Sequence, residues 1–169
     1  MRLSCVPLPV LLLTAALMPA FAWGATPLTA LNGQWSGGGT DRDGPFGTLQ
    51  PTRCRATLKA DATHLTSTTE CDGAAGLHKR FHLAVTFQGE RFTGSVEQVS
   101  SVPGAASTRY AGSVSGSREG DVANFTANFG ALIPSAHVTL AVTSANSYSM
   151  RVSLLGSTLT DVTLRRSPH

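Results

Sequence analysis

Apolar and polar residues alternate along most of this chain, and this period of two is the feature that most constrains its fold. Phe81, Leu83, Val85 and Phe87 are each followed by a polar or small residue, and the turn sequence Gln-Gly-Glu ends the run at 88–90. Successive side chains of a β-strand point to opposite faces of its sheet, so the alternation predicts a strand with one buried face. The turn predicts that this strand belongs to a hairpin.

The same pattern continues through the rest of the chain. Further alternating runs cover 92–96, 110–114, 125–129, 138–142, 148–154 and 162–164. Turn signals rich in Gly, Pro, Asn and Ser lie at 103–104, 117–120, 130–134, 145–147 and 155–157. No run has the 3.6-residue period of an amphipathic helix, and only a short helical turn near 74–78 is expected. We therefore predict an all-β protein, an antiparallel meander of about nine or ten strands.

A meander of this length must protect its edge strands, either by closing into a barrel or by splitting into two packed sheets. Glycines inside the predicted strands, among them Gly94, Gly112 and Gly116, favour the barrel. A strand bends more sharply where a side chain is missing. We predict a small closed barrel, with a two-sheet β-sandwich as the alternative.

The N-terminal residues have the pattern of a secretory signal peptide. Arg2 is followed by an apolar run at 6–17 and by an Ala-Phe-Ala sequence at 20–22. The run is shorter than the roughly 20 residues of a membrane-spanning helix. We predict that residues 1–24 are a signal peptide and that residues 25–169 form a single β-domain. The protein is therefore expected to be periplasmic or secreted.

Charge and aromatic content exclude two kinds of partner. The chain has 13 Lys and Arg and 10 Asp and Glu, and its cations are spread along the sequence. Binding to nucleic acid needs clustered cations, so no nucleic-acid partner is expected. The 2 Trp, 2 Tyr and 7 Phe are few for the two aromatic girdles of a membrane-spanning barrel, so a membrane-spanning domain is not expected either.

Two cysteines follow residue 24, and we predict that they form a disulfide. An even number of cysteines in an exported chain is typical of disulfide bonding. If 61–64 is a tight turn, antiparallel pairing places Ala56 opposite Thr69 and Cys54 opposite Cys71, within disulfide reach. The spacing matches neither a CxxC redox motif nor paired zinc ligands, so a disulfide is favoured over a redox or metal role.

Candidate catalytic and metal-binding residues are sparse. His78 and His82 have a spacing that binds a metal from a helix, but on a strand they lie roughly 13 Å apart. The segment 112–116 has Val114 where a nucleophile elbow requires serine. Nothing in the pattern of the acidic residues selects a glycosidase pair. We therefore predict no catalytic residue, no metal and no cofactor, and we expect that the protein is not an enzyme.

The two ends of the predicted domain resemble a known pattern. The sequence Gly-Gln-Trp at 33–35 opens the domain, and Arg165 and Arg166 end its last predicted strand. Together they resemble the calycin pattern of lipocalins and avidins. This resemblance implies a calycin-like barrel in which Trp35 is buried at the closed end with a basic side chain packed over it. Because Arg166 shares the strand parity of Leu164, we expect Arg166 to make that contact.

A second resemblance covers most of the predicted domain. The opening at 31–40 (LNGQWSGGGT), the segment at 54–57 (CRAT) and the closing segment at 160–166 (TDVTLRR) resemble small exported proteobacterial proteins of unassigned function. This resemblance implies a family and brings no activity with it.

A third resemblance concerns inhibitors. The Leu-x-Gly-x-Trp opening at 31–35 is similar to that of bacterial inhibitors of secreted alkaline metalloproteinases, which are small exported barrels with one disulfide. In those proteins an N-terminal segment enters the protease cleft. The resemblance implies that 25–30 would be that segment here.

Two classes of function are expected for such a barrel. The first is a binding module for a small apolar or amphipathic ligand, with Trp35, Phe87 and Tyr110 as candidate lining residues. The alternative for these aromatics is that they fill a solid core, so a cavity of ~300 Å³ or more would favour ligand binding. The second class is a protein-interaction module, such as a protease inhibitor or envelope accessory protein, that uses 37–47 or 100–108. The expected partner is thus a small ligand or an envelope or secreted protein.

Overall fold

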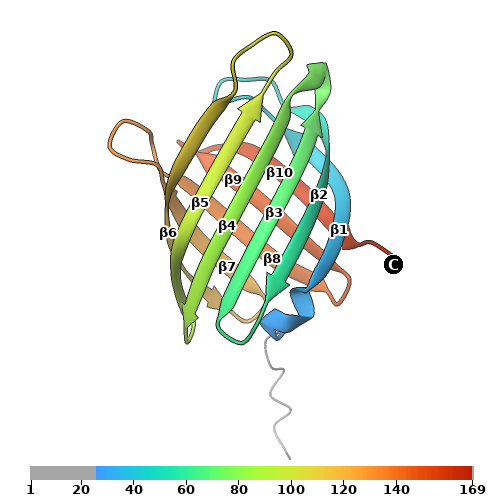
Figure 1. Cartoon of the computed structure of the whole chain (residues 1–169), viewed down its shortest axis with the longest axis vertical. Coiled ribbons are helices and arrows are strands. Elements are labelled where there is room, and N and C mark those ends of the chain that lie inside the picture. Colours follow the sequence, from blue (N-terminus) through green and yellow to red (C-terminus); the bar gives the residue numbers. More distant parts are fainter. Residues whose placement is uncertain (1–25, 169) are drawn as a thin grey trace, which may run out of the picture.

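The structure, a computed structural model, describes residues 26–168 as a closed barrel of ten β-strands (Figure 1). The strands are β1 (Gly33–Asp41), β2 (Gln50–Ala60), β3 (His64–Gly73), β4 (His78–Gln88), β5 (Arg91–Ser101), β6 (Thr108–Glu119), β7 (Val122–Asn128), β8 (Ala136–Ser144), β9 (Ser147–Leu154) and β10 (Ser157–Arg166). Two short 3₁₀ helices accompany them, η1 (Leu28–Leu31) and η2 (Ala74–Gly76). The second helix lies where the sequence predicts a short helical turn.

Each strand pairs antiparallel with its neighbours in the chain, and β1 pairs with β10 to close the barrel. The predicted all-β antiparallel meander is therefore confirmed, and it is a small barrel rather than a two-sheet sandwich. The interior of a barrel widens with the number of strands, and eight strands already suffice to hold one small ligand. A barrel of ten strands has room for an internal site.

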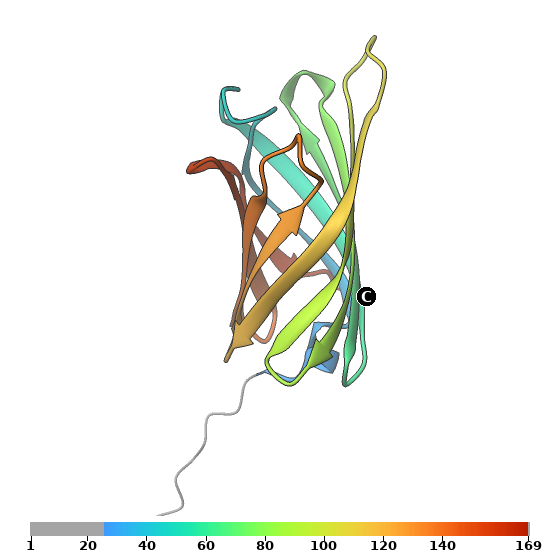
Figure 2. The same cartoon turned by 90° about the vertical axis from the view of Figure 1, so that its left-hand side faces the viewer.

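The two ends of the barrel differ because the strands alternate in direction. One end, which we call the loop end, is formed by the connections 42–49, 74–77, 102–107, 129–135 and 155–156. The other, the turn end, is formed by η1 and the tight turns 61–63, 89–90, 120–121 and 145–146. The loop end is uppermost in Figures 1 and 2, where the connection 102–107 extends past the strands.

The hairpin of β2 and β3 has the register that the sequence predicts. Ala56 is paired with Thr69 and Cys54 with Cys71. The two cysteines form the predicted disulfide, and both are buried in the core. A tight turn at 61–63 therefore sets the pairing of the whole hairpin.

Glycines let β1 lie very close to β10 at the seam that closes the barrel. A Cβ on Gly37 would lie 2.0 Å from the carbonyl oxygen of Thr163, and a Cβ on Gly39 would lie 2.0 Å from that of Asp161. Any larger residue at these positions would force the two backbones apart. The segment 37–47, expected as a glycine-rich interaction segment, is strand through residue 41 and loop only beyond it.

Trp35 and Arg166 lie together at the turn end. The Trp35 side chain is 1% exposed, and its Nε1 donates a hydrogen bond to the carbonyl oxygen of Leu31 at 3.0 Å. The guanidinium carbon of Arg166 lies 4.5 Å from the centroid of the indole, a distance at which a cation and an aromatic face attract. Arg166 also donates hydrogen bonds to two backbone carbonyl oxygens in or next to η1. The sequence predicts Arg166 rather than Arg165 for this contact, and Arg166 makes it.

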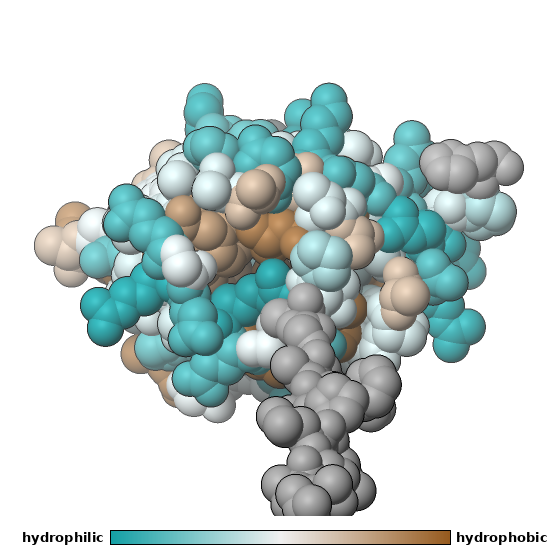
Figure 3. All heavy atoms as spheres, turned by 90° about the horizontal axis from the view of Figure 1, so that it is seen from below, coloured by the Kyte–Doolittle hydropathy of each residue, from teal (hydrophilic) through white to brown (hydrophobic). Residues whose placement is uncertain are grey.

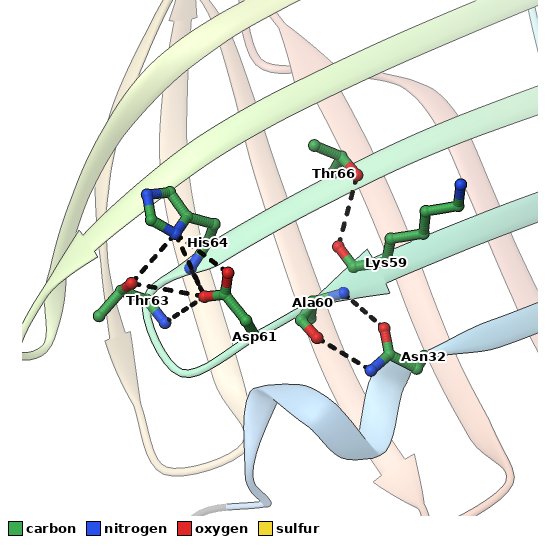
Figure 4. A network of polar contacts seen from close by, with 7 residues as sticks. All are labelled: Asn32, Lys59, Ala60, Asp61, Thr63, His64 and Thr66. Atoms are coloured by element: carbon green, nitrogen blue, oxygen red, sulfur yellow. Dashed lines mark hydrogen bonds and ion pairs between the residues drawn. The ribbon is translucent and has the colours of Figure 1, made fainter.

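Polar contacts join η1 to the first hairpin turn (Figure 4). Asn32 Nδ2 donates to the carbonyl oxygen of Ala60 at 2.9 Å, and the Ala60 N–H donates to Asn32 Oδ1 at 2.5 Å. In the turn, Asp61 Oδ1 accepts the backbone N–H groups of Thr63 and His64, both at 2.8 Å. These two donors lower the pKa of the Asp61 carboxyl to about 2.

The predicted signal peptide, residues 1–24, lies outside the described residues. Residues 26–168 form one barrel around one core cluster. Within 26–168, no helix has the length and apolar character needed to cross a membrane.

Candidate functional site

A cavity of about 300 Å³ lies inside the barrel. Inward-facing side chains from β2 through β10 form its wall. β1 contributes no lining residue. Its inward positions hold Trp35 near the turn end and two glycines, Gly37 and Gly39, at the seam. The last inward position holds Asp41, which forms an ion pair. The cavity is thus a property of the closed barrel rather than of any one hairpin.

Strands β7, β8 and β9 form an apolar wall of the cavity. Their lining side chains are Phe125, Ala127, Ala136, Val138, Leu140, Tyr148, Met150, Val152 and Leu154. The period of two directs these residues inward and the polar residues between them outward. Closer to the turn end, the Phe92 ring packs against Phe87 and Phe125, with centroids 4.9 and 5.7 Å apart. The deeper part of the cavity is therefore apolar.

Polar side chains gather on the facing wall, near the loop end. Lys79 on β4, Ser100 on β5 and Thr108 on β6 are paired across adjacent strands and form one row. Gln98 is paired with Tyr110 in the next inward-facing row, and its Nε2 donates to Ser100 Oγ at 3.0 Å. All five side chains line the cavity, and their strands lie in front of β7–β9 in Figure 1. We call them the polar row; together with the apolar wall they make the cavity amphipathic.

A buried ion pair lies at the polar row. Lys79 Nζ is 2.8 Å from Asp41 Oδ2, and the two side chains are 5% and 4% exposed. Lys79 Nζ also donates a hydrogen bond to the carbonyl oxygen of Arg42 at 2.6 Å, and Thr160 Oγ1 donates to Asp41 Oδ1 at 2.7 Å. Buried opposite charges are stable together only when further hydrogen bonds satisfy them. Both charges have such partners here.

The cavity reaches solvent at the loop end. Asp43 and Pro134, in two of the connections at that end, both line the cavity and are exposed. Tyr110 likewise lines the cavity while 37% exposed. A residue can be both lining and exposed only where a cavity meets the surface. These residues therefore mark the mouth of the cavity.

The structure separates the three aromatic residues that the sequence suggests as ligand contacts. Tyr110 lies at the mouth of the cavity. Trp35 does not line the cavity; it packs under Arg166 at the turn end and contacts Tyr148 edge to face, with centroids 5.1 Å apart. Phe87 is also absent from the lining and packs against another phenylalanine below the cavity. Trp35 in the core and Phe87 packed against it therefore fit the alternative in which these aromatics fill the interior, and of the three only Tyr110 lines the cavity.

The histidines considered as metal ligands are paired with other groups. His78 Nδ1 lies 2.8 Å from Asp72 Oδ1, and His82 Nδ1 lies 3.2 Å from Thr68 Oγ1. His82 is exposed on the barrel's outer surface. Among the described residues, no three His, Cys, Asp or Glu side chains are grouped to hold a metal ion.

Sequence reasoning missed Lys79, Asp41 and Thr160. A signal for Lys79 is present, because it has the parity of Phe81 in the alternating run and must therefore face the interior. Its partner could not be found in this way. Asp41 belongs to β1, and only the curvature of the barrel brings β1 and β4 within reach of one another.

No protein-family model matches this sequence, and the curated proteins contain no match to it. The resemblances to calycins, small exported proteins and protease inhibitors therefore stay predictions.

Proposed function

We propose that this chain is an exported, non-catalytic protein that binds a small amphipathic ligand inside its barrel. The observation that carries this proposal is the cavity of about 300 Å³ with an apolar wall and a polar row. Ligand pockets in proteins start at ~300 Å³ and combine mostly apolar walls with a few polar groups. The apolar part of the ligand lies against β7–β9, and its polar group lies near Lys79.

The ion pair limits the kind of polar group that the site accepts. Lys79 has three N–H donors, and Asp41 and the carbonyl oxygen of Arg42 are its acceptors among the described residues. One donor is left for a ligand oxygen. Because Asp41 already balances the charge of Lys79, this lysine offers a further buried anion no free counter-charge. The site therefore favours a neutral hydroxyl, ester or amide over a carboxylate.

The disulfide supports export. Disulfides persist in oxidising compartments and are rare in the cytosol. The bond between Cys54 and Cys71 agrees with the signal peptide predicted at 1–24. Both features favour a periplasmic or secreted location for the ligand-binding barrel.

A fluorescent apolar probe tests the proposal. We expect a naphthylamine probe, whose emission rises when it leaves water, to bind the protein with one site. A long-chain alcohol should displace it more strongly than the carboxylic acid of the same chain length. Absence of probe binding would contradict the proposed ligand binding. Equal displacement by the alcohol and by the carboxylic acid would contradict the proposed preference for a neutral headgroup.

A matched pair of variants locates the probe. Ala136 is buried and lines the cavity, whereas Ala111 is exposed on the outside of β6. Ala136→Phe fills the cavity and should abolish probe binding, while Ala111→Phe should leave it unchanged. Near-ultraviolet circular dichroism checks that both variants are folded. Equal binding by the two variants would place the probe outside the barrel.

The alternative function, protease inhibition, is less well supported by the contacts of 26–31. The Thr26 N–H donates to Asp121 Oδ1 at 2.8 Å, and Arg118 donates to the Thr26 carbonyl oxygen. The following η1 helix packs beside β2 and accepts hydrogen bonds from Trp35 and Arg166. A segment that enters a protease cleft must project from its barrel, and this one is held against the turn end.

A further inference from the structure

Exposed apolar side chains are concentrated at the loop end. The large apolar residues that the described chain exposes are Phe46 (94%), Leu132 (98%), Leu155 (66%), Leu49 (42%), Val102 (38%) and Tyr110 (37%). Five lie in the connections that form the loop end, and Tyr110 lies near the loop-end start of β6. Single exposed apolar residues are ordinary on protein surfaces, but their collection at one end of a barrel is not.

The two ends also differ in charge. Of the loop-end connections, only 42–49 contains charged residues, and these are the neighbours Arg42 and Asp43, of opposite sign. At the turn end, three of the four tight turns carry an acid, namely Asp61, Glu90 or Asp121. Figure 3 views the turn end and shows hydrophilic residues around its rim, with hydrophobic residues recessed at the centre. Within 26–168, the loop end is the end whose exposed apolar tips have few charged groups beside them, so burying them in an apolar phase costs less there than at the turn end.

The backbone at Leu155 gives an independent indication. Leu155 has φ 51° and is the one non-glycine residue with positive φ among the residues described. Tight turns of this kind favour Asn-Gly, because a branched side chain is strained in the left-handed region. Gly89 and Gly120 occupy such positions in two turns at the opposite end. A leucine here is unfavourable for folding, and its exposed side chain indicates a role outside the folded chain.

We propose that the loop end docks onto the surface of a lipid bilayer, with Phe46, Leu132 and Leu155 inserted at the boundary between headgroups and acyl chains. The mouth of the cavity lies among these residues, marked by Tyr110 and Pro134. Docking therefore brings the cavity into contact with the bilayer. On the basis of the proposed ligand-binding function, an amphipathic lipid then passes between membrane and barrel without crossing water.

A bilayer fits this end better than a protein partner does. The most exposed tips are two leucines and a phenylalanine on three separate connections, and the connections offer few charged groups for pairing. Protein interfaces typically add about ten hydrogen bonds around their aromatic and arginine anchors, and the three most exposed tips carry no side-chain group that can make one. Apolar side chains that bury 5–10 Å into the headgroup boundary are what a membrane-surface protein uses.

Co-sedimentation with neutral phosphatidylcholine vesicles tests the docking. Intact-mass analysis first establishes where the N-terminus of each purified protein lies. Only proteins with the same N-terminus are compared, so residues 1–24 cannot cause a difference in vesicle binding between them. We expect the original protein to bind, with little dependence on salt because the vesicles carry no net charge. Leu132→Asp with Leu155→Asp should weaken binding by about tenfold or more, since two apolar side chains leave the bilayer.

Charges added at the other end provide the control. Ala62 and Ala145 are exposed in turns of the turn end. Ala62→Asp with Ala145→Asp adds the same charge there and should bind vesicles like the original protein. Equal loss of binding in both double variants, or no binding by the original protein, would overturn the proposal.

Leu155→Asn separates docking from folding. Asparagine relieves the turn, so the melting temperature should rise by roughly 2–4 °C while vesicle binding weakens. If Leu155 had only a structural role, replacing it would lower both the melting temperature and vesicle binding. That result would contradict the proposal.

The vesicle and probe experiments fail independently. Ala136→Phe should lose the fluorescent probe and keep vesicle binding, whereas Leu132→Asp with Leu155→Asp should do the reverse. Vesicle binding without probe binding would overturn the ligand-binding function and leave docking in place. Probe binding without vesicle binding would overturn docking alone.

Discussion

At the scale of single residues, the chemistry of the interior depends on Lys79. Its ammonium lies in the barrel 2.8 Å from the Asp41 carboxylate, which also accepts a hydrogen bond from Thr160. The pair places two opposite charges beside the cavity, and these two charges balance each other. For the ligand that we propose, the pair would supply a hydrogen-bond donor and would not offer an anion a free counter-charge.

Removing the lysine should destabilise the protein strongly. Lys79→Met leaves the Asp41 carboxylate buried without its cation, which we expect to lower the free energy of unfolding by about 3–5 kcal/mol. Adding Asp41→Asn should recover much of this loss, because the neutral amide still accepts the hydrogen bond from Thr160. Urea unfolding followed by circular dichroism measures both. If the single and double variants were equally unstable, the charge of Asp41 would not be the cause.

At the scale of elements, the hairpin of β2 and β3 is fixed by its turn and by its disulfide. Its turn at 61–63 is held by Asp61, whose carboxylate accepts two backbone N–H groups, and its register brings the two cysteines opposite each other. Asn32 ties the end of the hairpin to η1, below the core. The turn end is thus closed by local polar contacts, while the loop end stays open.

The charge of Asp61 should stabilise the protein in a defined pH range. Its pKa falls from an ordinary 3.8 to about 2 in the folded protein, so the stabilisation is complete above about pH 4 and is lost as the pH falls through about 2. Asp61→Asn keeps an accepting oxygen and removes the charge. We expect this variant to melt below the original protein near neutral pH, with a difference that vanishes toward pH ~2. Thermal unfolding at a series of pH values measures it; a difference independent of pH would contradict it.

At the scale of the whole molecule, closure between β1 and β10 shapes the candidate site. It encloses the cavity, and the curvature that closure requires brings Asp41 on β1 within reach of Lys79 on β4, across β2 and β3. The seam itself depends on glycines whose missing side chains let two backbones approach. The up-and-down order of the strands then gathers every second connection at the loop end.

Replacing a seam glycine should therefore weaken the whole barrel. A Cβ at Gly39 would lie 2.0 Å from the backbone carbonyl oxygen of Asp161, whereas a Cβ at Gly73 would meet Leu77 at an ordinary 3.5 Å. We expect Gly39→Ala to lower the free energy of unfolding by ~1–3 kcal/mol, through overpacking against rigid backbone. Gly73→Ala, the control, should change it little. Equal effects of the two substitutions in urea unfolding would show that the seam is not tightly packed.

The sequence by itself determined the secondary structure, the β2–β3 register and the disulfide. These features depend on contacts that are local along the chain: a period of two, and a short turn that sets the pairing on both sides of it. The inward direction of Lys79 follows from the same parity. The contact between Trp35 and Arg166 followed from a resemblance at the two ends of the domain, which closure brings together.

Only the tertiary structure decided what surrounds these residues. An inward-facing aromatic side chain lines the cavity or fills the core depending on the width of the barrel and on its position along the barrel axis. Tyr110 lines the cavity, whereas Trp35 and Phe87 do not. The partner of Lys79 lies three strands away. Phe46, Leu132 and Leu155 are far apart in sequence, and each alone would be an unremarkable exposed residue. They lie at one end of the barrel because a closed meander returns the chain to the same end after every pair of strands.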